Sequence, residues 1–239
     1  MNGIILGAAV VVTVIALHEG ISQKKIEKNQ DLGTNVVSIF PGRDVFDDSI
    51  ESIHTLVPAD AEALAKQDFV DSISPEVNTS DTIRFLDKSV TARINGVGRD
   101  HFRINGIEFL EGATFRQDRN TPLEVIIDDN ARKAFFNGTG IEVIGQVIFL
   151  GSVPAKVIGI AKINNHDLNR INVWMPYSTV MYCMTGKPVL SSISVRIKDN
   201  IDNEAAINSI YHLLIMRHGV KDFQLYNFER IKKLSNSPQ

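Results

Sequence analysis

Two adjacent aspartates, Asp128 and Asp129, are the first candidates for acid–base chemistry in this sequence. Paired carboxylates act together only when both face one substrate, whereas the side chains of adjacent residues diverge. The pair also precedes the helical segment ARKAFF, where anionic side chains cap the first turn and favour its positive end. We therefore predict that these aspartates cap a helix and do not catalyse.

The histidines have no spacing typical of a metal site. No HExxH motif occurs, and His212 and His218 are six residues apart, on different faces of a predicted helix. His166 and Asp167 lie in a polar loop, NNHDLNR, which indicates no third partner for an acid–base dyad. The remaining histidines are His18, His54 and His101. We expect no metal site and no catalytic histidine.

Cofactor and nucleophile motifs are also missing from the sequence. Without a GxxxxGK[ST] phosphate loop, the chain is not expected to hydrolyse ATP in the usual way. Gly96 and Gly98 match two glycines of a dinucleotide fingerprint, but the third glycine and the following helix are absent. Cys183 stands in an apolar stretch and is predicted to be a small buried side chain. The sequence thus predicts a chain with no catalytic residue and no bound cofactor.

Composition describes an ordinary globular chain. Of the 239 residues, 44% are hydrophobic and 22% are charged, and the formal net charge is -3. A core can therefore form, and the composition does not favour disorder. Nucleic acid is excluded as a partner because phosphate neutralisation needs a clustered excess of Lys and Arg.

The first residues indicate contact with a membrane. Residues 3–17 form an uncharged run that would span only about 22 Å as a helix, against about 30 Å of bilayer hydrocarbon. No polar face recurs at helical spacing, so a buried core helix is the less favoured alternative. We interpret residues 1–34 as the outer part of a transmembrane helix followed by a polar stalk. The predicted membrane-embedded residues are Ile4, Ile5, Leu6, Val10, Val11, Val12, Val14, Ile15 and Leu17.

Two strand–helix–strand units bracket the soluble part. The first comprises a strand at 35–40, a helix from Pro58 and a strand at 70–77 that Pro75 places at an edge or ends early. The second comprises a strand at 192–197, a helix from the N-cap Asp202 to Gly219 and a strand at 222–228. Such units combine into a split βαβ sandwich with four strands on one side and two helices on the other.

The segment between the two units is predicted to be mostly β. Short strands are expected at 82–86, 89–97, 123–127, 146–150 and 155–163, with a hairpin turn at Gly151 and Ser152. Short helices are expected after Asp128 and after Pro176. The fold class is therefore α+β. We divide it into a βαβ subdomain of residues 35–78 and 189–230, an inserted subdomain of residues 79–188, and a tail of residues 231–239.

Seven stretches, in order, carry a resemblance to a known family. They are LGTNVVSIFPG at 32–42, ADAEALAKQ at 59–67, INGVG at 94–98, VIIDDNARKAFF at 125–136, LGSVPAKVIGIA at 150–161, INVWMPYSTVM at 171–181 and SSISVRIKDN at 191–200. The sequence resembles the periplasmic region of the MacB family of macrolide-export ABC transporters over nearly its whole length.

The resemblance implies a porter-like subdomain interrupted by a mainly β insertion. It also implies a homodimer in the inner membrane whose cytoplasmic ATPase domain, outside this chain, binds ATP and Mg, with a second transmembrane helix after residues 231–239. The periplasmic partners would be the adaptor MacA and the outer-membrane channel TolC, and ATP hydrolysis would drive macrolides or other periplasmic substrates into the channel. A lipoprotein-release or FtsX-like division transporter is the alternative within this class. A periplasmic enzyme is a remote alternative, which turnover of hydrolase substrates would reveal.

Overall fold

The computed structural model describes residues 35–42, 55–115, 123–162 and 170–227. Within these ranges the strands form one 10-stranded sheet in the order β10-β1-β9-β2-β3-β8-β5-β7-β4, with β6 paired to β2 and β7. The residues predicted to be embedded in a membrane lie outside these ranges. No helix in the described part of the chain is long and apolar enough to cross a membrane.

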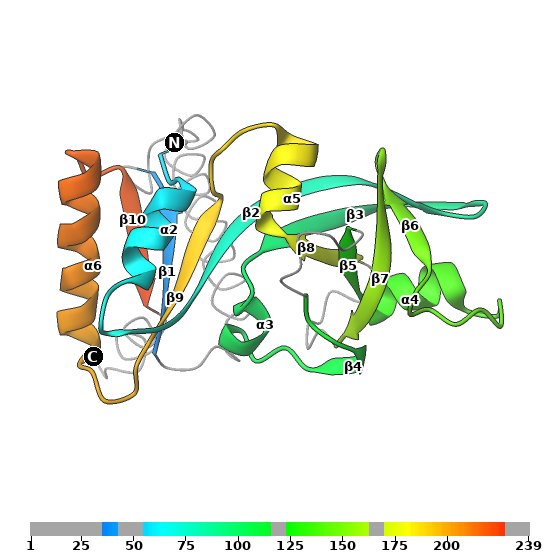
Figure 1. The fold of residues 1–239 in the computed structure, drawn as a ribbon, viewed down its shortest axis with the longest axis horizontal. Coiled ribbons are helices and arrows are strands. Elements are labelled where there is room, and N and C mark those ends of the chain that lie inside the picture. Colours follow the sequence, from blue (N-terminus) through cyan, green and yellow to red (C-terminus); the bar gives the residue numbers. More distant parts are fainter. Residues whose placement is uncertain (1–34, 43–54, 116–122, 163–169, 228–239) are drawn as a thin grey trace, which may run out of the picture.

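A first lobe is built from the two predicted strand–helix–strand units. Its elements are β1 (Val36–Pro41), α2 (Pro58–Ala65), the first half of β2 (Val70–Phe85), β9 (Ser192–Ile197), α6 (Asn203–His218) and β10 (Phe223–Asn227). Asp202 accepts a hydrogen bond from the Ala205 amide, and Gly219 ends α6 with φ of 75°, so both predicted helix boundaries are confirmed. Figure 1 shows α6 and α2 beside these strands at one end of the elongated molecule.

Apolar side chains from both helices and the sheet form the core of the first lobe. The inward face of α6 carries Ala206, Ile210 and Leu214, which belong to one buried cluster with residues of the strands. Ile39 and Val195 are fully buried within that cluster. The burial of α6 at every fourth residue follows from its helical repeat.

A second lobe continues the sheet. Its elements are β3 (Lys88–Val97), α3 (His101–Ile104), β4 (Phe109–Gly112), β5 (Glu124–Asp128), α4 (Asp129–Phe136), β6 (Val147–Leu150), β7 (Val153–Ala161), β8 (Asn172–Pro176), α5 (Tyr177–Thr179) and the π-helix η2 (Val180–Thr185). The β-rich character and the β6–β7 hairpin, with Gly151 at φ of 60°, are confirmed. The sequence patterns did not predict α3, β4 or β8.

Strand β2 joins the two lobes and corrects the prediction of separate strands at 70–77 and 82–86. It runs unbroken for 16 residues, pairing with β9 from Val70 to Glu76 and with β3 from Glu76 to Phe85. Pro75 does not end the strand, because the ladder with β3 begins only one residue later and Pro75 is paired on one side alone. The boundary drawn between residues 78 and 79 lies inside this strand.

The helix expected after Pro176 is confirmed, and it consists of one short turn of α-helix followed by the π-helix η2. The prediction for Cys183 within this segment is wrong. Cys183 lies on η2 and is exposed, not buried. The residues of η2 that pack inward are Val180 and Met181, so the apolar run around Cys183 places its neighbours, not Cys183 itself, in the core.

Candidate functional site

A polar cluster lies where β2 passes from the first lobe to the second, with buried His101, Ser192 and Ser194 around the partly buried Glu76. Glu76 pairs with Ser192 of β9 on one side and with Val97 of β3 on the other. Its carboxylate accepts hydrogen bonds from Ser192 Oγ at 3.0 Å and Ser194 Oγ at 3.1 Å. The same carboxylate lies 3.1 Å from Nδ1 of His101. We call Glu76, His101, Ser192 and Ser194 the junction cluster.

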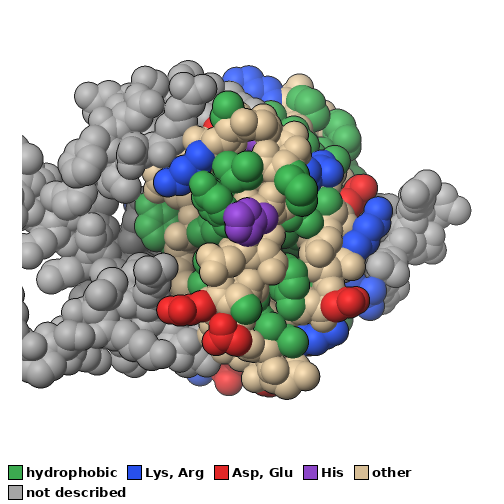
Figure 2. Space-filling view, turned by 90° about the vertical axis from the view of Figure 1, so that its left-hand side faces the viewer, with side chains coloured by type: hydrophobic (Ala, Val, Ile, Leu, Met, Phe, Trp, Pro, Cys, Tyr) green, Lys and Arg blue, Asp and Glu red, His purple; other side chains and the backbone are tan. Residues whose placement is uncertain are grey.

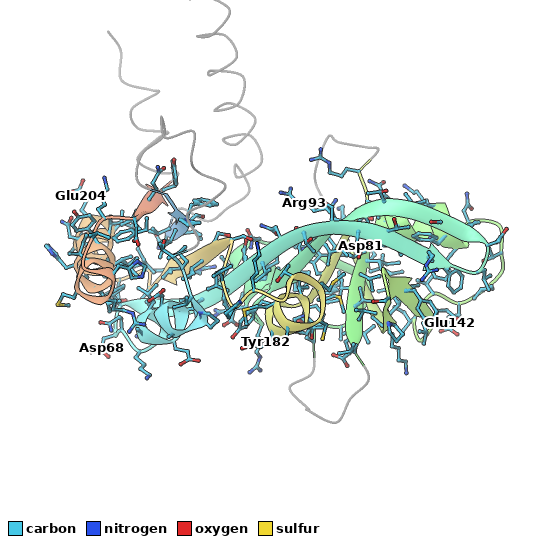
Figure 3. The ribbon with its side chains drawn as sticks, turned by 90° about the horizontal axis from the view of Figure 1, so that it is seen from above. Asp68, Asp81, Arg93, Glu142, Tyr182 and Glu204 are labelled. Carbon is cyan, nitrogen blue, oxygen red and sulfur yellow. The ribbon has the colours of Figure 1, made fainter. Side chains whose placement is uncertain are left out.

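The alternation of β9 explains why its serines reach Glu76. Ser192 and Ser194 share one face of the strand, and Ile193 and Val195 point to the core beneath the helices. The junction cluster and α3 therefore lie on the sheet face opposite α2 and α6. In Figure 3 the side chains of this elongated sheet are seen from above, with Asp68 and Glu204 in the first lobe and Glu142 in the second.

Gly98 allows α3 to approach β2 closely enough for His101 to reach Glu76. Its amide donates to Ser74 Oγ at 3.0 Å. A Cβ at this position would lie 2.8 Å from Ser74 Cα and 2.7 Å from Pro75 Cδ, so a side chain does not fit. Asn105 completes the turn by donating to the His101 carbonyl at 2.8 Å. The turn that carries His101 is thus held against β2.

The electrostatics of the junction cluster favour a structural tie over acid–base catalysis. Burial acts to raise the pKa of Glu76, but the hydrogen bond and charge of His101 and the two serine hydroxyls hold that pKa below its ordinary value. A general acid needs the opposite shift, toward the working pH. Glu76 is therefore an ionised acceptor that joins β2, β9 and α3.

A second polar cluster connects the helices of the first lobe. The buried Asp60 lies 2.7 Å from Arg217 Nε and 3.2 Å from His218 Nε2, and His218 Nδ1 lies 2.6 Å from Asp222 Oδ1. These contacts tie the first turn of α2 to the end of α6 and the start of β10. Among the residues that the structure describes, no group of three or more His, Cys, Asp or Glu is placed to hold a metal.

Asp128 and Asp129 have separate structural roles, which confirms the predicted capping. Asp128 Oδ1 accepts from the Ala131 amide at 2.7 Å and Oδ2 accepts from the Asn172 amide at 2.8 Å. Asp129 forms ion pairs with Arg132 and Lys133. Burial raises the pKa of Asp128, whereas the hydrogen bond from Lys133 lowers that of Asp129. The two carboxylates therefore do not act on one ligand.

The other singled-out residues are dispersed over the fold. Gly96 faces η2, where an added Cβ would lie 2.8 Å from Val180 Cβ, so this glycine serves close packing. His212 is exposed on α6. His18, His54, His166 and Asp167 lie outside the described residues. The structure brings together instead Glu76, His101 and two serines, which are up to 118 residues apart in the chain.

Comparison with known proteins gives concordant matches. The MacB-like periplasmic core domain family matches residues 1–213. The chain is 67% identical over 235 residues to the macrolide export ATP-binding/permease protein MacB of Escherichia coli, covering 98% of this chain and 36% of that protein. It is 43% identical over 239 residues to MacB of Sodalis glossinidius, covering 98% of this chain and 37% of that protein. The chain thus spans about a third of the length of these relatives.

Two solved structures share the fold. The periplasmic region of MacB from Actinobacillus actinomycetemcomitans is 30% identical, with a TM-score of 0.78, over 90% of this chain and 100% of that one. The extracellular domain of the noncanonic ABC-type transporter YknZ from Gram-positive bacteria is 18% identical, with a TM-score of 0.66, over 81% of this chain and 100% of that one. The second likeness concerns the fold alone.

Proposed function

Since this chain belongs to the family of MacB-like periplasmic core domains, we propose that it is the periplasmic part of a macrolide-export ABC transporter in the inner membrane. A cytoplasmic ATPase domain outside this chain supplies ATP and Mg chemistry, and two copies form the transporter. The adaptor MacA and the channel TolC receive the substrate. The chain itself transmits force and carries no chemistry.

The observation that carries this proposal is the continuity of β2 through both lobes. A strand of 16 residues inside a sheet cannot bend freely, because each half is held by a ladder, to β9 in one lobe and to β3 in the other. The junction cluster adds bonds across the same point. A displacement applied to the first lobe is therefore delivered to the second lobe with little loss.

The hydrogen bonds of three inward-facing carboxylates favour this role over an enzyme. Glu76, Asp60 and Asp128 are each held by two or more donors of the protein itself. A catalytic acid or base needs a face open to substrate. A lipoprotein-release transporter remains the alternative in the same class, and the names of the relatives favour macrolide export.

Complementation tests the proposed function. The full-length transporter is expressed in cells that lack their own macrolide exporter, with or without the adaptor and the channel. We expect erythromycin resistance to rise only when all three proteins are present, because an inner-membrane transporter alone has no route through the outer membrane. Resistance without adaptor or channel would contradict the tripartite assembly, and rescue of lipoprotein release would favour the alternative.

A further inference from the structure

Two acidic and two basic side chains converge where α6 ends. Asp60 lies in the first turn of α2, Arg217 and His218 are the last two residues of α6, and Asp222 directly precedes β10. Asp60 is 1% exposed and Asp222 is 6% exposed, so both carboxylates are buried. Figure 2 views this end of the molecule, where other charged side chains are scattered among hydrophobic ones at the surface. We call Asp60, Arg217, His218 and Asp222 the α6 clamp.

The ring of His218 lies between the two carboxylates. Its Nδ1 lies 2.6 Å from Asp222 Oδ1, and its Nε2 lies 3.2 Å from Asp60 Oδ2. An ionised carboxylate can only accept hydrogen bonds, so each contact needs a proton on the nitrogen that faces it. Neutral imidazole has a single N–H, and either tautomer would direct a lone pair at a carboxylate oxygen. Only the doubly protonated imidazolium satisfies both contacts.

The charge balance of the α6 clamp favours the same protonation state. Asp60 also accepts hydrogen bonds from Arg217 Nε at 2.7 Å and from the Val57 amide at 2.9 Å. With a charged His218 ring the clamp contains two anions and two cations. With a neutral ring it would contain one uncompensated negative charge, which is costly in a buried setting. The negative end of the α6 dipole also favours a cation at the last residue of the helix.

The other neighbours of the ring do not replace this charge. Phe223 of β10 contacts it edge-on, with the two ring centroids 5.9 Å apart. Lys221, beside Asp222 in the chain, is exposed. Among the residues that the structure describes, Asp60 and Asp222 are the only acidic groups paired with the His218 ring. The attachment of α6 to α2 and β10 at this point therefore depends on the two ring protons.

We propose that His218 is the cationic member of a pH-dependent clamp, which holds α6 against α2 and β10 while the ring carries both protons and weakens when it loses one. The folded chain then binds this proton more tightly than the unfolded chain. The clamp's contribution to stability is thus fully present below the ordinary histidine value of about 6.5 and is lost as the pH rises above it. Alkaline conditions should loosen the first lobe at this point.

Nitrogen NMR of the chain with labelled histidine rings tests the charge state directly. The nitrogen signals of imidazolium differ from those of either neutral tautomer, and backbone assignment identifies those of His218. At about pH 7.5, where an ordinary histidine is about nine-tenths neutral, we expect His218 to be mostly doubly protonated. Asp222→Asn removes one charge but keeps an acceptor, and should raise the neutral fraction several-fold. A single-proton pattern for His218 in the wild-type chain at this pH would overturn the proposal.

Urea unfolding at several pH values tests the consequence for the fold. Between about pH 6 and about pH 9 the urea midpoint of the wild-type chain should fall relative to that of His218→Gln, which has no ring proton to lose. His212→Gln is the matched control, because His212 lies on the same helix and is exposed. Its profile should follow the wild type. Parallel profiles of the wild type and His218→Gln, or equal flattening by His212→Gln, would overturn the proposal.

Both readouts concern this chain alone and are independent of macrolide export. Should His218→Gln fail to fold, the nitrogen spectra of the wild type and of Asp222→Asn still decide whether the ring is doubly protonated.

Discussion

Replacing Glu76 with alanine is expected to lower the free energy of unfolding of this chain by about 3 kcal/mol. The substitution removes the carboxylate that the members of the junction cluster share. The Ser192 and Ser194 hydroxyls and the His101 ring then stay buried but lose their hydrogen-bond partner. An intact buried network of charged groups contributes little net stability. Removing one partner nevertheless lowers the free energy of unfolding strongly, because the remaining polar groups stay desolvated and lose their partner. Urea unfolding of both proteins measures the difference.

Glu111→Ala, at an exposed position on β4, is the control and should change stability little. Acid titration gives a second readout. Because the folded-state pKa of Glu76 is lowered, its contribution is present above the ordinary glutamate pKa and is lost as pH falls through the folded-state pKa. The wild-type protein should therefore lose more stability in that acid window than Glu76→Ala. Parallel pH profiles would show that Glu76 is not the tie inferred here.

Gly98→Ala is expected to lower the free energy of unfolding by about 3 kcal/mol, the upper part of the range for overpacking. The new Cβ would lie 2.8 Å from Ser74 Cα and 2.7 Å from Pro75 Cδ, and this part of β2 is held in the sheet and cannot retreat. The insertion should also move α3 and lengthen the contact between His101 and Glu76.

Gly138→Ala is the matched control for this substitution. A Cβ at Gly138 meets nothing within 4 Å, so its cost should arise only from the backbone φ of 76°, about 1 kcal/mol. Urea unfolding of the two alanine variants should separate them by about 2 kcal/mol. Equal losses would mean that the approach of α3 to β2 is less restricted than the Cβ distances indicate.

The local elements of the fold were predictable because their signals are local. Asp202 caps the start of α6, Gly219 caps its end, and Gly151 forms the β6–β7 turn. Each of these signals depends only on a residue and its near neighbours in the sequence. The length of β2 was not predictable in this way. Pro75 predicts an interruption, and only the late start of the neighbouring β3 ladder explains why the strand continues.

The junction cluster was missed because its members are distant in sequence. Glu76 is 25 residues from His101 and 118 from Ser194, and each residue alone is unremarkable in a strand or a loop. The usable signal was the i, i+2 spacing of Ser192 and Ser194, which predicts two hydroxyls on one face of a strand. Identifying their acceptor required the register between β9 and β2. Cys183 was misplaced for a related reason, since an apolar stretch does not show which of its residues turn outward on η2.

The proposed transmission of force requires the two lobes to move as one body. It is tested most directly by the distance between spin labels at Asp68→Cys in the first lobe and Glu142→Cys in the second, in the full-length transporter with Cys183→Ser. Diluting labelled with unlabelled copies confines the signal to one chain. Rigid transmission predicts a single narrow distance distribution that is the same without nucleotide and with bound ATP. A shift or a second population on ATP binding, in a transporter that still exports macrolide, would contradict it.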